Sequence, residues 1–168
     1  MYTPEYSAEK FRGLMLYAAH RARKSRDRWF GAVKLNKILF YCDFISYQRY
    51  GHPITGATYQ KLEEGPAPKE LLREREHLVN EGLATVTPVQ VFNYVQHRLV
   101  PTSKSVNPND YFDEREIAVI NEVITELEHL TAAEVSEMSH REMGWRAARM
   151  QEEIPYDAAI LAPFPYES

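Results

Sequence analysis

The pattern of apolar and polar residues along the chain predicts mainly helices. The first predicted helix begins after Ser7, which stands in the position of an N-cap. A second helix, from about residue 34 to 50, is apolar on almost every side, and Gly51 suits the left-handed conformation that ends many helices. We therefore expect the second helix to lie at the centre of the fold. Apolar residues after Ser7 recur with the spacing of one helical face: Phe11, Leu14, Met15, Ala18 and Ala19.

The stretch after the second helix predicts short strands and a further helix. Residues 58–62 alternate enough for a strand, and the Gly-Pro-Ala-Pro sequence at 65–68 breaks it. Pro68 suits the first turn of a helix that we expect to run to about Glu81. Residues 84–91 and 93–100 are then predicted to form two strands, with Pro88 at an edge or in the turn. The apolar side chains expected to face inward from the helix are Leu71, Leu72, Leu78 and Val79.

Capping-box spacings mark expected helix starts in the C-terminal third, at Asp113, Thr131 and Ser139. From Ile154 the chain carries three prolines, and we expect it to lie along the surface. The predicted fold class is α+β, mainly helical, with a helical bundle around a central apolar helix and a small antiparallel sheet. We expect a single domain over residues 1–153 and a Pro-rich C-terminal tail over 154–168.

Composition and charge indicate the cellular setting. The net charge of −4 hides an asymmetry, because residues 1–40 carry +6 and residues 110–168 carry −10. These parts either attract each other within the fold or bind partners of opposite charge. No apolar run approaches the ~20 residues of a membrane span. The N-terminus lacks the pattern of a signal peptide, and the single Cys42 excludes an internal disulfide. We expect a cytoplasmic protein.

Residues for catalysis or cofactor binding are scarce. No two histidines have the i, i+4 spacing of a helical metal pair, and the chain has no Gly-rich phosphate loop and no G-x-S-x-G sequence. A Cys42 nucleophile with His140 as base is conceivable. However, Cys42 falls on the apolar stripe of the central helix, where a thiol is usually an inert hydrophobe. We expect no enzymatic activity, no metal and no cofactor.

Asp43, His140 and Trp145 have the most unusual surroundings. Asp43 lies within the most apolar helix, where a carboxylate needs a hydrogen bond or an ion pair, or else it serves a recognition surface. His140 and Trp145 lie in an acidic helical region. They are either packed inside the fold or part of a binding hot spot together with Arg146.

Residues 70–101 are similar to a winged-helix unit, in which a helix precedes a two-stranded wing and often enters the DNA major groove. This helix offers three positive charges against four negative ones, which suits phosphate binding poorly. The basic stretch at residues 21–28 is an alternative source of phosphate contacts. We therefore expect a scaffold for protein contacts and keep DNA binding as the less favoured alternative.

An ordered set of motifs extends from the central helix to the C-terminal third. In chain order it comprises Lys34-Leu-Asn-Lys-Ile-Leu-Phe-Tyr41, Asp43, Gly51-His-Pro-Ile-Thr-Gly56, Tyr59, Gly65-Pro66, and Ser139-His140 followed by Trp145. This set resembles the Panacea domain family, also called the SocA-like antitoxin domain. The resemblance covers the chain from about residue 10 to 150.

The resemblance implies a bacterial or phage protein of a two-gene toxin–antitoxin system. It implies an antitoxin that neutralises a cognate toxin protein by direct binding, and the family brings no established catalytic residues. Two alternatives stay open: a proteolytic adaptor that delivers the toxin to a AAA+ protease, and a winged-helix-like DNA-binding regulator. The partner-binding residues that we expect are Asp43, Tyr59, Glu64, Gly65, Pro66, His140, Trp145 and Arg146.

Overall fold

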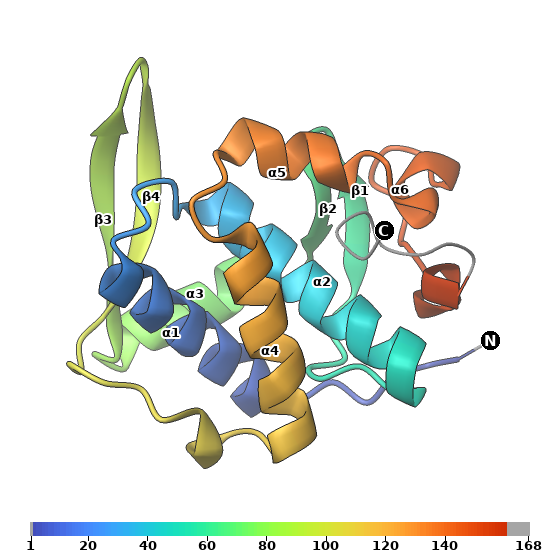
Figure 1. The fold of residues 1–168 in the computed structure, drawn as a ribbon, viewed down its shortest axis with the longest axis horizontal. Helices are drawn as coiled ribbons and strands as arrows, with labels where there is room; N and C mark the ends of the chain where they lie inside the picture. The colour runs from blue at the N-terminus through green and yellow to red at the C-terminus, as the bar shows by residue number, and fades with distance from the viewer. Residues whose placement is uncertain (1, 161–168) are drawn as a thin grey trace.

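A computed structural model describes residues 2–160, and a single long helix forms its centre (Figure 1). This helix, α2 (Ala32–Tyr50), packs against α1 (Ala8–Ser25), α4 (Glu114–Leu127) and α5 (Ala132–Ser139). It buries thirteen of its residues, on all sides, as its apolar pattern predicts. Gly51 ends it in the left-handed conformation, with φ 81°, and donates its backbone N–H to the carbonyl of Tyr47 at 2.8 Å.

The first helix also follows the prediction. The Ser7 hydroxyl accepts a hydrogen bond from the backbone N–H of Lys10 at 3.1 Å and so caps α1. All five apolar residues of the predicted face are buried. Arg26 ends the helix at φ 59°, a conformation that non-glycine residues adopt only at some cost. A short loop from residue 26 to 31 then leads into α2.

The Gly-Pro-Ala-Pro segment corrects one prediction. Strand β1 (Tyr59–Leu62) pairs antiparallel with β2 (Gly65–Pro68), so the segment is itself a strand and not a break, and Pro68 is not in a helix. The backbone N–H of Lys69 donates to the carbonyl of Thr58 at 2.8 Å. Hydrogen bonds alternate along an antiparallel pair, so Pro66 and Pro68 occupy the positions that need no N–H toward β1.

Helix α3 (Leu71–Asn80) and the hairpin of β3 (Ala84–Val91) and β4 (Tyr94–Pro101) form the predicted winged-helix-like unit. The hairpin projects from one end of the molecule (Figure 1). Leu71 and Leu78 are buried, but Leu72 is 66% exposed and Val79 41% exposed, so two of the four inward predictions for this helix are wrong. One face of the helix is enough to contact α1 and β3, and these two residues lie outside that face.

The C-terminal helices begin where two of the three capping boxes predict. Asp113 with Glu116 caps α4, and Thr131 with Glu134 caps α5, each by reciprocal hydrogen bonds. The third box is wrong: Ser139 is the last residue of α5 and donates its hydroxyl to the carbonyl of Ser136. The remaining short elements are η1 (Pro108–Asp110), α6 (Met143–Ala147) and η2 (Tyr156–Ile160).

The segment after α6 runs along the edge of β1, where exposed residues alternate with buried ones. The backbone N–H of Ile154 donates to the carbonyl of Tyr59 at 2.8 Å, and Gln151 donates to that of Lys61 at 2.7 Å, so this segment covers the free edge of β1. Ile154, Tyr156 and Ala159 are buried in the core. The last part of the predicted tail, residues 161–168, lies outside the described residues.

The basic N-terminal and acidic C-terminal parts of the chain are joined by a partly buried ion pair, in which Lys10 on α1 lies 2.7 Å from Glu116 on α4. Helix α4 is also paired with the central helix, because Arg49 on α2 lies 2.8 Å from Glu122. The predicted fold class, α+β and mainly helical, is confirmed. Over residues 2–160, none of the helices combines the length and the apolar character needed to span a bilayer.

Candidate functional site

The β1–β2 hairpin is held in place by two aromatic residues that the sequence singled out. The indole N–H of Trp145 donates to the carbonyl of Leu62 at 2.9 Å, and His140 Nε2 lies 2.8 Å from the carbonyl of Glu63. The two rings stack on each other with centroids 4.2 Å apart. Lys61 Nζ lies 4.0 Å from the centroid of the Trp145 ring, a cation–π contact. His140 and Trp145 therefore clamp the hairpin to the C-terminal helices.

Strand β2 of the hairpin packs on α2. Lys37 donates its Nζ to the carbonyl of Pro66 at 3.0 Å, and burial lowers the pKa of this lysine to about 7, against an opposing effect of Glu64. Gly65 lies so close to α5 and α2 that a β-carbon at this position would be 2.2 Å from Ser139 Oγ and 2.6 Å from Lys37 Cε. Gly65 and Pro66 are thus buried against the scaffold and offer little surface to a partner.

Asp43 and Tyr59 form a buried hydrogen-bonded pair. The Tyr59 hydroxyl donates to Asp43 Oδ2 at 2.7 Å, and the backbone N–H of Thr55 donates to Oδ1 at 2.6 Å. Asp43 is 0% exposed, and burial raises its pKa to about 6 although these hydrogen bonds favour the charged form. The internal hydrogen bond that we considered for Asp43 is therefore present. Neither residue reaches the surface, so direct partner contact by these two side chains is not supported.

Six of the eight predicted binding residues lie in this hairpin or clamp it from the C-terminal helices, a seventh, Asp43, holds Tyr59 from within α2, and Arg146 lies apart from the hairpin. Asp43 braces the loop before β1 from within α2, and Arg146 is exposed on α6. Glu64 differs from the other hairpin residues because its side chain is exposed at the turn and lines a cleft. The residues brought together are Tyr59, Glu64, Gly65, Pro66, His140 and Trp145.

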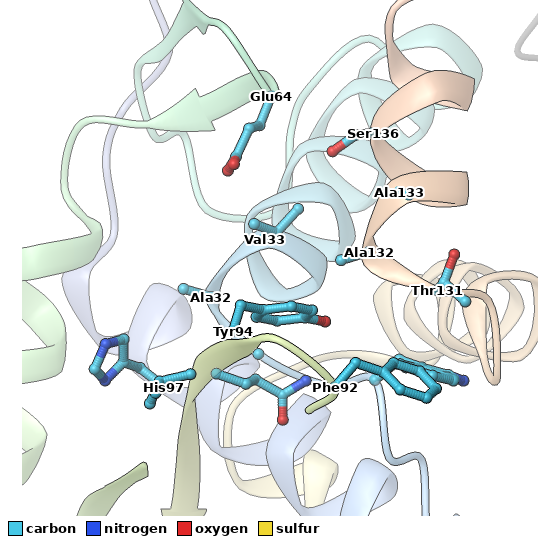
Figure 2. Close-up of a pocket in the computed structure, with 14 residues that line it drawn as sticks. Ala32, Val33, Glu64, Phe92, Tyr94, His97, Thr131, Ala132, Ala133 and Ser136 are labelled. Atoms are coloured by element: carbon cyan, nitrogen blue, oxygen red, sulfur yellow. The ribbon is translucent and has the colours of Figure 1, made fainter. Parts of the chain in front are cut away.

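The cleft next to Glu64 has a volume of about 760 Å³ and a mainly apolar lining. Figure 2 shows its walls: the turn with Glu64, the first turn of α2 with Ala32 and Val33, α5 from Thr131 to Ser136, and the β3–β4 hairpin. Elements far apart in the sequence thus share one open surface. The hairpin contributes Phe92, Tyr94, Val95, Gln96 and His97.

Aromatic side chains at the mouth of the cleft are unusually exposed. Phe92 is 78% exposed and stands at φ 51°, a region that bulky residues avoid. Its ring stacks on Trp29, with centroids 5.7 Å apart, and the Arg28 guanidinium lies 5.2 Å from the Trp29 ring. Sequence reasoning missed this cluster. The available signal was the aromatic Phe92 between the two predicted strands, at a hairpin turn where Asn or Gly is usual.

The chemistry of the described residues suits binding. Cys42 is buried and burial raises its pKa well above the usual value, so it is not an activated thiolate. Within residues 2–160 no three His, Cys, Asp or Glu side chains gather in a way that could hold a metal ion. The cleft itself combines apolar and aromatic walls with a few polar groups, which is the usual character of a binding site.

The comparison with protein families matches most of this scaffold. The family model for the antitoxin SocA-like Panacea domain matches residues 35–146. The chain belongs to this family. The match runs from α2 through both hairpins to Trp145 and Arg146 on α6, and it supports an antitoxin role in general terms. No curated protein and no solved structure matches this SocA-like chain.

Proposed function

We propose that this SocA-like domain neutralises a cognate toxin by direct protein–protein binding, and that the toxin docks in the cleft between the β3–β4 hairpin and α5. The observation that carries the proposal is the exposed, strained Phe92 at the mouth of an apolar cleft in an antitoxin-family scaffold. A bulky residue at positive φ destabilises the folded state, and such strained residues cluster at functional sites.

The residues around the cleft have the character of a protein-binding hot spot. Tryptophan, tyrosine and arginine are enriched at such spots. Trp29 and Tyr94 line the cleft together with Phe92, and the Arg28 guanidinium lies over the Trp29 ring. Exposed apolar side chains in one concave area favour a protein partner over a charged polymer. The exposed face of α3, with apolar Leu72 and Val79 among acidic residues, likewise favours protein contacts over DNA.

The experiment co-expresses the protein with the product of a neighbouring open reading frame that is toxic on its own. Wild-type protein restores growth and co-purifies with the toxin. The double variant Phe92→Asn/Tyr94→Ser loses rescue and co-purification while remaining folded. The control Met150→Ser removes an exposed apolar residue outside the cleft and keeps full rescue. Full rescue by the cleft variant would exclude the cleft as the docking site.

The amount of toxin in the same cultures separates neutralisation by binding from delivery to a AAA+ protease. Neutralisation by binding leaves the toxin at an unchanged or higher level in a stable complex. A shortened toxin half-life that depends on the protease would replace this proposal with the adaptor function. If no toxic neighbour is rescued under any condition, the antitoxin role itself fails for this protein.

A further inference from the structure

A second hollow lies beside the cleft, on the other side of the loop between α1 and α2. It has a volume of about 320 Å³, and four arginines from three parts of the chain line it. Arg23 comes from the last turn of α1, Arg26 and Arg28 from the loop, and Arg98 from β4. No carboxylate lines this hollow among the described residues. Its remaining walls are apolar: Ala19, Ala22, Phe30, Leu99 and Val100.

Two of these arginines are fixed by the backbone. Arg23 donates to the carbonyls of Pro101 at 3.0 Å and Ser103 at 2.8 Å. Arg98 donates to the carbonyls of Phe30 at 3.1 Å and Arg28 at 2.7 Å. Each guanidinium has five N–H donors, so both keep donors for another acceptor. Held in this way, they lose little side-chain freedom when an anion binds.

The other two arginines have no acceptor of their own. Within residues 2–160, the side chains of Arg26 and Arg28 make no hydrogen bond and no ion pair, and both residues are exposed. The intervening Asp27 does not neutralise them, because it is only 3% exposed and pairs with Lys34 at 2.8 Å. Like charges that gather without a counter-charge repel one another. An anion in the hollow would relieve that repulsion.

We propose that this arginine-lined hollow binds an acidic peptide segment of the protein partner, with a carboxylate on the guanidinium groups and a neighbouring apolar side chain on the floor. Guanidinium and carboxylate match in charge and in bidentate geometry. The apolar floor favours a peptide over a nucleic-acid backbone, which would present only phosphate and sugar. Helix α3 of the winged-helix-like unit is a poor reader of DNA because its negative charges outnumber its positive ones.

The hollow and the cleft are positioned to serve one partner. Arg28 lines the hollow and the next residue, Trp29, lines the cleft. Likewise, residues 95–97 of β4 face the cleft and residues 98–100 border the hollow. That this partner is the toxin rests on the proposed function. The preference of the hollow for an acidic peptide does not depend on the proposed function, and a probe peptide tests this preference separately.

The first experiment follows the side-chain Nε–Hε signals of arginine in the ¹⁵N-labelled protein during titration with short, end-capped peptides. One peptide places two glutamates around a leucine, and its matched control has glutamines instead. We expect saturable shifts of arginine signals with the acidic peptide. Binding should weaken about ten-fold with the glutamine peptide and with Arg26→Gln/Arg28→Gln. The charge-matched control Lys24→Gln/Lys104→Gln alters two exposed lysines that do not line the hollow and should bind as the wild type does.

Three results would overturn the proposal. The first is the absence of saturable binding by the acidic peptide. The second is equal binding by both peptides, which would make the site purely apolar. The third is tighter binding of inorganic phosphate or of a short DNA duplex to the same arginine signals, which would assign the hollow to phosphate groups. Thermal unfolding of each variant checks that the fold is retained.

The second experiment repeats the toxin rescue with Arg26→Gln/Arg28→Gln. If wild type rescues and this variant binds the toxin about ten-fold more weakly, the hollow belongs to the toxin interface. If wild type never rescues, the antitoxin function fails while the peptide titration still decides the hollow. Unchanged toxin binding by the variant would exclude the hollow from that interface.

Discussion

The ring of Phe92 stacks on the indole of Trp29, with centroids 5.7 Å apart and planes inclined by 25°. This contact joins the tip of the β3–β4 hairpin to the loop that leads into α2. It therefore fixes one wall of the cleft relative to another. It also leaves 78% of Phe92 exposed, so the stack offers a large apolar surface to a partner.

Replacing Phe92 by Asn separates the stability of the hairpin from its proposed use. Asparagine tolerates positive φ better than phenylalanine, which offsets the loss of the stack with Trp29. We expect the free energy of unfolding to change by less than about 1 kcal/mol and toxin affinity to fall at least about ten-fold. Urea unfolding and titration calorimetry measure the two effects. Unchanged affinity in a folded variant would show that Phe92 makes no contact.

Replacing Trp145 by Phe tests whether this residue clamps the hairpin or contacts the partner. The change removes the donor to the Leu62 carbonyl and weakens the contact with Lys61. We expect a loss of about 1–2 kcal/mol in the free energy of unfolding, with the toxin affinity of the folded protein retained. Unchanged stability together with lost affinity would instead make Trp145 a contact residue.

Replacing Gly65 by Ala should destabilise the protein more than the same change at Gly82. Both glycines have positive φ, at 116° and 71°, so both changes introduce backbone strain. Only Gly65 also brings a β-carbon against Ser139 and Lys37, whereas nothing lies within 4 Å of a β-carbon at Gly82. We expect a loss of about 1 kcal/mol at Gly82 and about 2–4 kcal/mol at Gly65. Equal losses would show that the hairpin is not tightly seated on α2.

Replacing Asp43 by Asn should change how stability depends on pH. Burial raises the pKa of Asp43 from the ordinary value of an aspartate carboxyl, 3.8, to about 6 in the folded protein. As pH rises, the Asp43 carboxyl loses its proton in the unfolded chain before it does so in the folded protein. Over this pH range the folded state binds more protons, so the free energy of unfolding falls. Asparagine does not titrate. The stability advantage of wild type over the variant should therefore shrink by about 2 kcal/mol between pH 4 and pH 7.

The measurement is the free energy of unfolding of both proteins across this pH range. A constant difference between them would mean that Asp43 has an ordinary pKa in the folded protein. Because the other titrating groups are common to both proteins, the difference isolates the contribution of this one carboxyl.

Local sequence patterns predicted the helices whose ends depend on nearby residues. Ser7, Gly51, Asp113 and Thr131 act through backbone groups within a few residues of themselves, so their effects are visible in the sequence. The apolar character of α2 on all sides likewise predicted its central place. The family motifs lie on this scaffold, which is why they identified the family.

The candidate site was predicted only in part because it depends on contacts between distant segments. Glu64 was predicted and lines the cleft, but the neighbours that complete its walls come from α2, α5 and the β3–β4 hairpin. Gly65–Pro68 became a strand because β1 supplied its hydrogen-bonding partners. Leu72 and Val79 followed the apolar pattern of α3, but no element packs on that face within residues 2–160.

The sequence by itself determined the family, the class of fold and the limits of most helices, because those depend on local hydrogen bonding and on the spacing of apolar residues. The tertiary structure alone decided which polar residues became internal braces and which surfaces stayed open. Asp43 and Trp145 are bonded within the fold, while Phe92 and the loop arginines are exposed. Burial and the pairing of distant groups arise only when the elements pack together, and they set where a partner can bind.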